Sequence, residues 1–333
     1  MNAALASVPL WVIVLIKSAI LLLIVVTTFA YSMLAERKIM AWMQLRPGPN
    51  RVGPWGMMQP AADALKMMFK EDLTPDTADP LIYRLAPFIS LICAMGTFAI
   101  IPFTGDAGGP YSVGNVNAGI LFIFSLTSIG VYGISLAGWA SGSKFPLLGS
   151  VRSTAQMISY ELSMSMSVIG VLILAGSTSL ATIVSAQARV WFIVPQIVGF
   201  IIYLITAVAE TNRAPFDLVE AETELVGGFH TEYSGLRFGL FFIAEYLNMI
   251  TVSCLATLLF LGGWNPLFGP SNAWLGLLWF IVKAGMFLFF YIWLRSTLPR
   301  LRYDRLMDFG WKVLLPVATL NLVVTALVIV VWG

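Results

Sequence analysis

Acidic residues are concentrated in one loop of this chain. Between residues 210 and 235 the sequence carries six carboxylates and one arginine, Arg213, although the whole chain of 333 residues has only 17 acidic residues. A plain solvated connector would tolerate this composition, but the concentration of acids favours a functional acidic cluster. The six carboxylates are Glu210, Asp217, Glu220, Glu222, Glu224 and Glu232.

The spacing within this acidic loop, residues 210–235, supports a functional interpretation. Pro215 restricts the residue before it to extended backbone and marks a stiff turn, with the aromatic Phe216 next to it. If the part after Pro215 is helical, Asp217, Glu220 and Glu224 share one face at i, i+3 and i+7. Like charges at this spacing destabilise a helix unless something offsets them. We therefore expect these acids to form a functional cluster and not only a solvated connector.

Further glutamates lie in apolar surroundings. Glu161 falls in the fourth apolar segment, Glu210 ends the fifth, and Glu245 lies about two turns into the sixth. A charge at the centre of a membrane helix costs about 2.5–3.5 kcal/mol on insertion scales, so such groups face the bundle interior and mark ion or proton pathways. Helix–helix hydrogen bonding is the alternative for Glu161. Three acids at comparable depth on the inner side outline a proton path.

Other titratable residues offer less chemistry. Lys283, in the seventh apolar segment, is a candidate counter-charge for the glutamates, and Lys17 either snorkels or meets an inward-facing partner. His230 is the only histidine, which excludes a histidine metal site, and we expect it at the surface. The two cysteines, Cys93 and Cys254, are too few for a disulfide framework or an iron-sulfur cluster and should behave as small hydrophobes.

The elements that position these residues are membrane helices. The chain is 59% hydrophobic and 11% charged, whereas soluble domains average about a quarter charged residues. Segments of about 20 apolar residues span a bilayer. The sequence predicts an all-α integral membrane protein with eight such spans in a single membrane domain, residues 1–333. The spans are residues 10–34, 81–101, 118–140, 154–175, 190–209, 238–261, 274–294 and 311–331.

Basic residues predict the orientation of these spans. Sixteen of the 19 lysines and arginines fall on one side, Arg189 alone falls on the other, and Lys17 and Lys283 lie within spans. Positive charge favours the cytoplasmic side, so both termini are expected outside and the acidic loop inside. The net charge of +2 gives no sign of nucleic-acid binding. We expect a multi-pass protein of the bacterial cell inner membrane, with the mitochondrial inner membrane as the alternative.

A ninth helix is predicted to lie in the membrane interface. Over residues 57–70, Asp63, Lys66 and Lys70 share one face, with apolar side chains that include Met68 and Phe69 opposite. An amphipathic helix without further function is the alternative. Methionine adapts to flexible apolar ligands, so a long lipid-soluble molecule could slide past such a helix. No nucleotide-binding glycine motif occurs in the preceding glycine- and proline-rich loop.

The last inner loop, residues 294–312, is basic. Anchoring to anionic lipids would explain its five basic residues. Beside the acidic loop it would also form a charge-patterned dock for a soluble protein. The five residues are Arg295, Arg300, Arg302, Arg305 and Lys312.

The chain resembles a known family over essentially its whole length, and three segments carry the resemblance. They read AERKIMAWMQLRPGPNRVGPWGMMQPAADALKMMFKED, AETNRAPFDLVEAETELVGGFHTEYSG and LPRLRYDRLMDFGWK. The chain resembles the quinone-site membrane subunit of respiratory complex I, which is the H-type subunit of bacterial NADH-quinone oxidoreductase and the first subunit of the mitochondrial enzyme. The resemblance implies an enzyme subunit, part of a proton-translocating translocase in the electron-transport chain, that itself carries no flavin, iron-sulfur cluster or metal.

The resemblance also implies roles for particular residues. The chain would line a chamber for ubiquinone or menaquinone together with soluble quinone-reducing and iron-sulfur subunits, beside other membrane subunits and lipids. The implied quinone-chamber residues are Glu36, Arg37, Asp63, Met68, Phe69, Arg213 and Phe216. The implied proton-coupling residues are Glu161, Glu210, Asp217, Glu220, Glu222, Glu224 and Glu245.

Three other functions remain open at this point. A stand-alone proton or cation carrier should show inverted repeats and broken helices, neither of which is evident in the sequence. A purely structural anchor would use the acidic loop only as a dock for soluble enzymes. Related hydrogenase-type complexes have membrane anchors that lack quinone.

Overall fold

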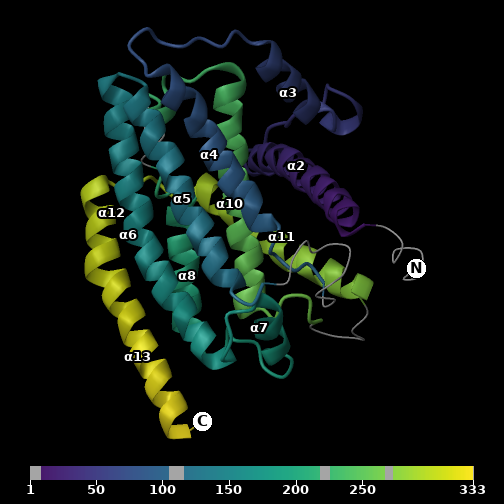
Figure 1. The fold of residues 1–333 in the computed structure, drawn as a ribbon, viewed down its shortest axis with the longest axis vertical. Coiled ribbons are helices and arrows are strands. Elements are labelled where there is room, and N and C mark those ends of the chain that lie inside the picture. The colour runs from purple at the N-terminus through teal and green to yellow at the C-terminus, as the bar shows by residue number, and fades with distance from the viewer. Residues whose placement is uncertain (1–8, 105–115, 218–225, 267–272, 333) are drawn as a thin grey trace.

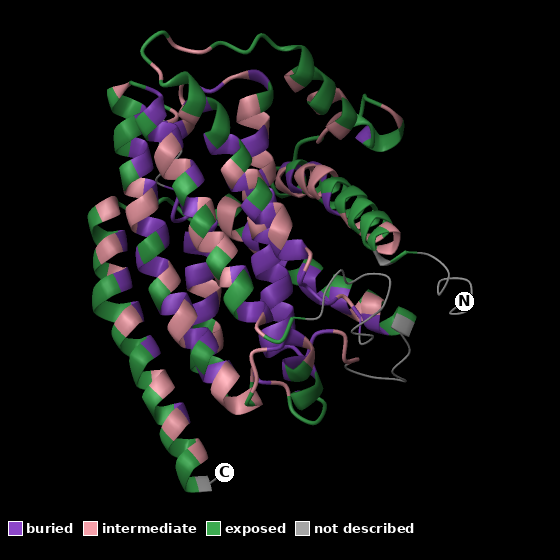
Figure 2. Ribbon diagram, in the orientation of Figure 1, coloured by how far each residue is buried: buried purple, intermediate pink, exposed green. Residues whose placement is uncertain are grey.

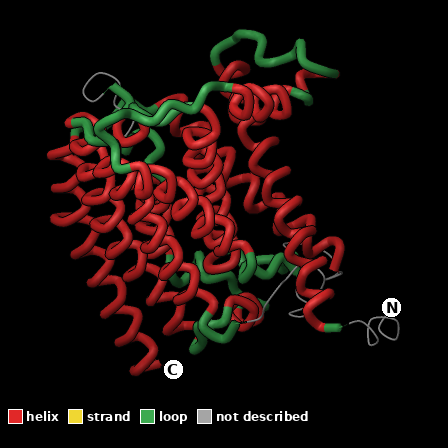
Figure 3. The backbone as a smooth tube through the Cα atoms, turned by 45° about the horizontal axis from the view of Figure 1, so that its top comes forward, coloured by secondary structure: helices red, strands yellow, loops and turns green. Residues whose placement is uncertain are grey.

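The structure, a computed structural model, describes residues 9–104, 116–217, 226–266 and 273–332. Throughout these residues the regular structure is helical, without strands (Figure 3). Three of the predicted acids, Glu220, Glu222 and Glu224, lie outside the described residues. The longer helices are α2 (Leu10–Met43), α4 (Pro80–Phe98), α5 (Gly119–Ala140), α6 (Lys144–Ala175), α10 (Gly235–Phe260), α11 (Ala273–Thr297) and α13 (Leu315–Trp332).

Short helices connect the long ones. Seven helices of the described chain are long and apolar enough to cross a membrane, the last of them formed by α12, a π-helical turn and α13 together. An eighth apolar helix, α8, is shorter. The integral-membrane, all-α prediction is confirmed. The short elements are α3 (Gln59–Phe69), α7 (Leu180–Ala186), α8 (Ile197–Glu210), α12 (Tyr303–Phe309) and the turns Pro54–Gly56, Gly228–His230 and Gly310–Leu314.

The fifth predicted span is only partly helical. Residues 190–196 form turns, and α8 has 14 residues, which is about 21 Å of helix compared with about 30 Å of bilayer hydrocarbon. The irregular stretch is buried on one side only: Phe192 and Gln196 are 8% and 1% exposed, whereas Val190 and Val194 are 55% and 69% exposed. Protein groups supply backbone partners here: the Phe192 amide donates to Gln187 Oε1 at 3.3 Å, and the Ile193 amide donates to the carbonyl of Phe260 at 3.0 Å. Irregular backbone at membrane depth is tolerated where protein surrounds it in this way.

Helix α6 is longer than the predicted fourth span. It begins at Lys144, ten residues before Thr154, because the stretch around Gly149 packs closely against the backbone of Gly228. Glu161 consequently lies near the middle of α6, 17 residues from Lys144 and 14 from Ala175, and not near its inner end as the sequence predicted. Most serines of α6 face the bundle, where Ser153, Ser159, Ser163 and Ser167 are buried.

Helix α10 is the centre of the bundle. It packs against α4, α11, α3, α8 and α2, and its second half is buried almost without interruption (Figure 2). Helix α13 lies at one edge, packed on α6 and exposed along most of its length. Helices α2 and α11 lean away from the other helices on the opposite side (Figure 1). This packing brings the end of α2, the acidic loop and the end of α11 together.

Helix α3 confirms the predicted short helix between the first two spans. It contains no buried residue and contacts α10 and α2. The side of α3 that meets the protein is mixed: Asp63 bonds to α2 and the half-buried Met67 lies against α10 at Gly239, whereas the predicted polar residues Lys66 and Lys70 are exposed. Met68 and Phe69 are also exposed, at 65% and 85%. The end of the bundle that carries α3 and residues 210–217 is called the inner end below.

Candidate functional site

A buried cluster of ions joins four segments at the inner end. Arg213, from the turn after α8, contacts Glu36 of α2 at 3.2 Å through Nη1 and Glu245 of α10 at 2.9 Å through Nε. Arg295 of α11 also bonds to Glu36. Glu36 and Arg213 are only 2% and 5% exposed. The predicted chamber residues Glu36 and Arg213 therefore meet, with Glu245 and Arg295 beside them.

Arg213 is held in its charged form. Burial by itself lowers the pKa of an arginine, but the Glu245 and Glu36 carboxylates outweigh it and raise the pKa of Arg213 above its ordinary value. The guanidinium also lies 4.4 Å from the ring centre of Tyr246, a cation–π contact. The backbone reverses after α8 at Asn212, whose φ is 50°, and this turn places Arg213 beside the two glutamates.

Some polar atoms of this ion cluster have no hydrogen-bond partner among the described residues. They are Glu36 Oε2 and Arg213 Nη2, both fully enclosed. A buried donor or acceptor left without a partner costs about 1–3 kcal/mol, and more when charged. Tyr246 interacts with both groups, and a head group or water would reach the free guanidinium N–H and carboxylate oxygen only after the enclosing side chains move.

A second ion pair ties α3 to α2. Arg37 donates to Asp63 at 2.7 Å, and Gln59 donates to the other oxygen of Asp63 at 3.0 Å. Two of the predicted chamber residues are thus together. Met68 and Phe69 do not join the ion cluster, because their side chains point away from the protein.

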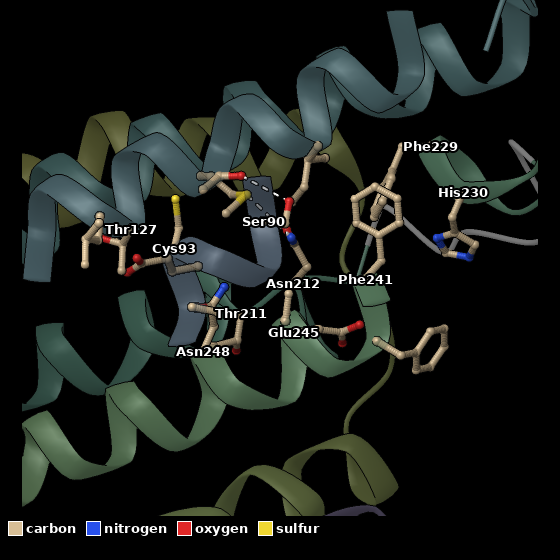
Figure 4. Close-up of a pocket in the computed structure, with 18 residues that line it drawn as sticks. Ser90, Cys93, Thr127, Thr211, Asn212, Phe229, His230, Phe241, Glu245 and Asn248 are labelled. Carbon is tan, nitrogen blue, oxygen red and sulfur yellow. Dashed lines mark hydrogen bonds between the residues drawn. The ribbon is translucent and has the colours of Figure 1, made fainter. Parts of the chain in front are cut away.

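A small cavity lies beside the ion cluster, between α4, α5, α8 and α10 (Figure 4). Most of its lining is apolar, but it is called the polar cavity below because two carboxylates reach it. Its volume is about 50 Å³, enough for a few water molecules at 10–15 Å³ each by this measure. Glu210 and Glu245, two of the predicted proton-coupling residues, both line it. The other polar lining residues are Ser90, Thr127, Thr211, Asn212, His230 and Asn248.

Glu161 lies next to this polar cavity without lining it. Its carboxylate accepts a hydrogen bond from Ser128 of α5, the neighbour of the lining residue Thr127. One turn before it, the Gln156 amide donates to the carbonyls of Ala209 and Phe216, at 2.8 and 2.9 Å. These bonds fix the α8 end and the start of the acidic loop against α6. Glu161 and Glu210 are thereby positioned by the same helix pair.

The acidic loop and the basic loop lie side by side, as predicted. Asp217 forms an ion pair with Arg300 at 3.2 Å, and the amide of Leu301 donates to the carbonyl of Pro215 at 3.0 Å. Phe216 is buried between them and its ring lies 5.7 Å from that of Tyr160. Asp217 thus meets the basic loop, while the predicted chamber residue Phe216 packs in the core beneath it.

The prediction for Lys283 was wrong. Its ammonium donates to the carbonyls of Leu261, Gly263 and Asn265, at 2.7, 3.0 and 2.8 Å, and lies 4.4 Å from the ring of Trp191. These carbonyls follow the C-terminal end of α10, where backbone acceptors lack helical partners. Lys283 therefore donates hydrogen bonds to the carbonyls that follow the C-terminal end of α10. It is not a counter-charge to the glutamates.

The prediction for His230 was also wrong. The imidazole is half-buried, edge-on to the rings of Phe229 and Phe238 with centres 5.0 and 5.2 Å away. Burial lowers its pKa to about 4, although the nearby Asp217 opposes this shift. A neutral imidazole at the edge of the polar cavity can donate from one nitrogen and accept at the other.

Sequence reasoning missed several residues of the site. Arg295 was assigned to the basic loop, and Tyr246, Ser128 and Asn248 were not singled out. Arg295 ends a span, so its charge at the membrane boundary was its only signal. The described residues contain no group of three or more histidine, cysteine or acidic side chains that could hold a metal ion.

Comparison with known proteins gives a consistent result. The family model described as NADH dehydrogenase matches residues 16–326. The second H-type subunit of NADH-quinone oxidoreductase from Geobacter sulfurreducens is 52% identical over 319 residues, 94% of this chain and 95% of that protein. The first H-type subunit of the Symbiobacterium thermophilum enzyme is 49% identical, covering 97% and 99%. The H-type subunit of the Deinococcus deserti enzyme is 53% identical, covering 96% and 85%.

Proposed function

Because this chain belongs to the NADH dehydrogenase family and is a membrane subunit of the NADH-quinone oxidoreductase type, we propose that it lines a quinone chamber and couples quinone reduction to proton translocation. The observation that carries this proposal is the buried ion cluster of Glu36, Arg213, Arg295 and Glu245 beside the polar cavity. The partners are the other subunits of the complex, including soluble redox subunits docked at the inner end. The redox centres that reduce the quinone belong to those partners.

The quinone, ubiquinone or menaquinone, enters between α2 and α3. Arg37 and Asp63 hold these two helices together at the entrance, and the exposed Met68 and Phe69 give the outer surface of α3 an apolar character. An isoprenoid tail suits such a surface, while the head group moves toward the ion cluster. There the unpartnered Arg213 Nη2 can donate to a quinone carbonyl.

Reduction changes the charge in the chamber, and the ion cluster passes this change to the polar cavity. Glu245 is the link, because it is bonded to Arg213 and also lines the cavity with Glu210. If a reduced quinone draws Arg213 away, Glu245 loses its counter-ion and its affinity for a proton rises. Protons would then pass through the cavity toward Glu210 and Glu161, with Asp217 on the inner side.

The proposal is tested by Glu210→Gln and Glu161→Gln in the assembled complex, incorporated in liposomes. We expect both variants to lose most NADH-driven proton uptake, because an amide keeps the shape of the side chain but carries no proton. Asp304→Asn is the matched control, since the Asp304 side chain is 73% exposed and does not line the cavity. Wild-type pumping and turnover in both glutamine variants would remove these residues from the route. Pumping by the purified chain alone would favour a stand-alone carrier.

We place the protein in a bacterial inner membrane, where its single membrane domain serves as one subunit of the complex. The relatives come from bacteria, and the long apolar helices make it a multi-pass membrane protein. Fractionation of the source cells, with detection of this chain together with NADH-quinone reductase activity, would test the assignment.

A further inference from the structure

A second hollow lies away from the ion cluster, where α2 and α11 lean away from the bundle (Figure 1). It is a groove of about 340 Å³, within the range of about 300–1,000 Å³ typical of ligand sites. Its floor is buried, with Ile250 and Cys254 from α10 and Phe280 from α11. Its rim is exposed, with Ile24 of α2 and Ile281 of α11 at 43% and 59%. The groove therefore opens sideways from the bundle.

The lining of this groove is apolar apart from two polar residues at opposite ends of its α2 wall, Lys17 and Thr28. Eleven residues separate them, which is about 16 Å of helix rise. That length is close to half of a bilayer's hydrocarbon thickness of about 30 Å. The groove therefore has the length of the hydrocarbon region of one leaflet.

Lys17 lies on α2 at the end of the groove away from the ion cluster. Nineteen residues separate it from Glu36 at the inner end, which is about 28 Å along the helix axis. Because α2 leans away from the bundle and Lys17 lies within the predicted first span, its ammonium would reach a phospholipid phosphate by extending along the helix, as lysines near membrane boundaries do. An ammonium carries three N–H donors, so a phosphate can share Lys17 with other acceptors.

We propose that this groove binds one acyl chain of an anionic phospholipid from the leaflet opposite α3, with the lipid phosphate against Lys17. The charge selects the lipid class, because one basic residue near an anionic head group gives roughly a fivefold preference. The apolar floor accepts the chain, and the open rim lets the lipid enter from the bilayer. This site is separate from the quinone chamber, which lies at the other end of α2.

The test uses the whole complex in phosphatidylcholine nanodiscs with a trace of a photoactivatable lipid whose diazirine is near the chain end. Cross-linked peptides are located by mass spectrometry. We expect phosphatidylglycerol to label the α2, α10 and α11 peptides roughly five times more than the phosphatidylcholine probe does. Lys17→Gln should remove this preference, and Lys17→Arg should keep it.

A second variant tests the groove itself. Gly285 lines the groove, and an added Cβ there meets no atom within 4 Å, so Gly285→Leu has room at its Cβ and is designed to occupy part of the groove. This variant should lose most of the labelling by either lipid. Val328→Leu, on the exposed side of α13, is the matched control and should be labelled as the wild type is.

Three results would overturn the proposal. They are equal labelling by both lipids in the wild type, unchanged labelling after Gly285→Leu, and cross-links of the groove residues to a neighbouring protein subunit in their place. None of these depends on quinone reduction. NADH-quinone reductase activity of the Lys17 variants should stay near the wild-type value whichever way the labelling falls.

Discussion

Replacing Arg213 by methionine should destabilise the protein more than any comparable change of a surface arginine. The side chain is 5% exposed and is bonded to both Glu36 and Glu245. Removing one partner of a buried ion pair typically costs about 3–5 kcal/mol, since the other charge stays buried without compensation.

The expected loss lies at the lower end of this range. Glu36 keeps Arg295 as a partner, and the Glu245 side chain is 26% exposed, so water can solvate it in part. The cation–π contact with Tyr246 adds to the loss. We therefore expect about 3 kcal/mol, which lowers the melting temperature by roughly 6 °C in a protein larger than about 200 residues.

The buried cysteines provide the assay. Cys93 and Cys254 are free and buried, so a thiol-reactive fluorophore reports their exposure as the chain unfolds in detergent. Arg302→Met is the control, because Arg302 is 79% exposed and lies 3.5 Å from an equally exposed Asp304, a pair worth about 0–1 kcal/mol. Equal melting temperatures for the Arg213 and Arg302 variants would refute the interpretation of the cluster as a buried ionic network.

Two further changes test the corrected assignments of His230 and Lys283. Because the folded-state pKa of His230 is about 4, below the ordinary value of about 6.5, the unfolded state binds more protons between these values. Stability should therefore fall as pH drops from 6.5 to 4, by up to about 3 kcal/mol. His230→Phe should abolish this part of the pH dependence in the same thiol assay, and an unchanged slope would contradict it. Lys283→Met should cost about 2–4 kcal/mol, since three carbonyls lose their donor; Lys144→Met, at the start of α6, serves as its control, and a loss no larger than the control's would refute the capping role.

Much of the fold follows from local sequence properties. Long apolar runs predict membrane helices because each helix satisfies its own backbone in hydrocarbon, and seven of the eight predicted spans contain helices long enough to cross. The fifth does not, because its first residues are held outside a helix by hydrogen bonds from the amides of Phe192 and Ile193 to the Gln187 side chain and the Phe260 carbonyl. A hydropathy profile does not include hydrogen bonds between residues that are distant in the sequence.

The candidate site divides in the same way. The sequence by itself determined which charged residues stand in apolar or crowded surroundings, because the cost of burying charge makes residues such as Glu161 and Glu210 conspicuous wherever they lie. Only the tertiary structure decided how charges were paired: Arg295 reaches Glu36 across 259 positions, while Lys283 caps a helix end instead of meeting a glutamate. Composition and hydrophobic periodicity are properties of the linear sequence. Ion pairing, in contrast, depends on distances of a few ångströms, which are set by the packing of the helices.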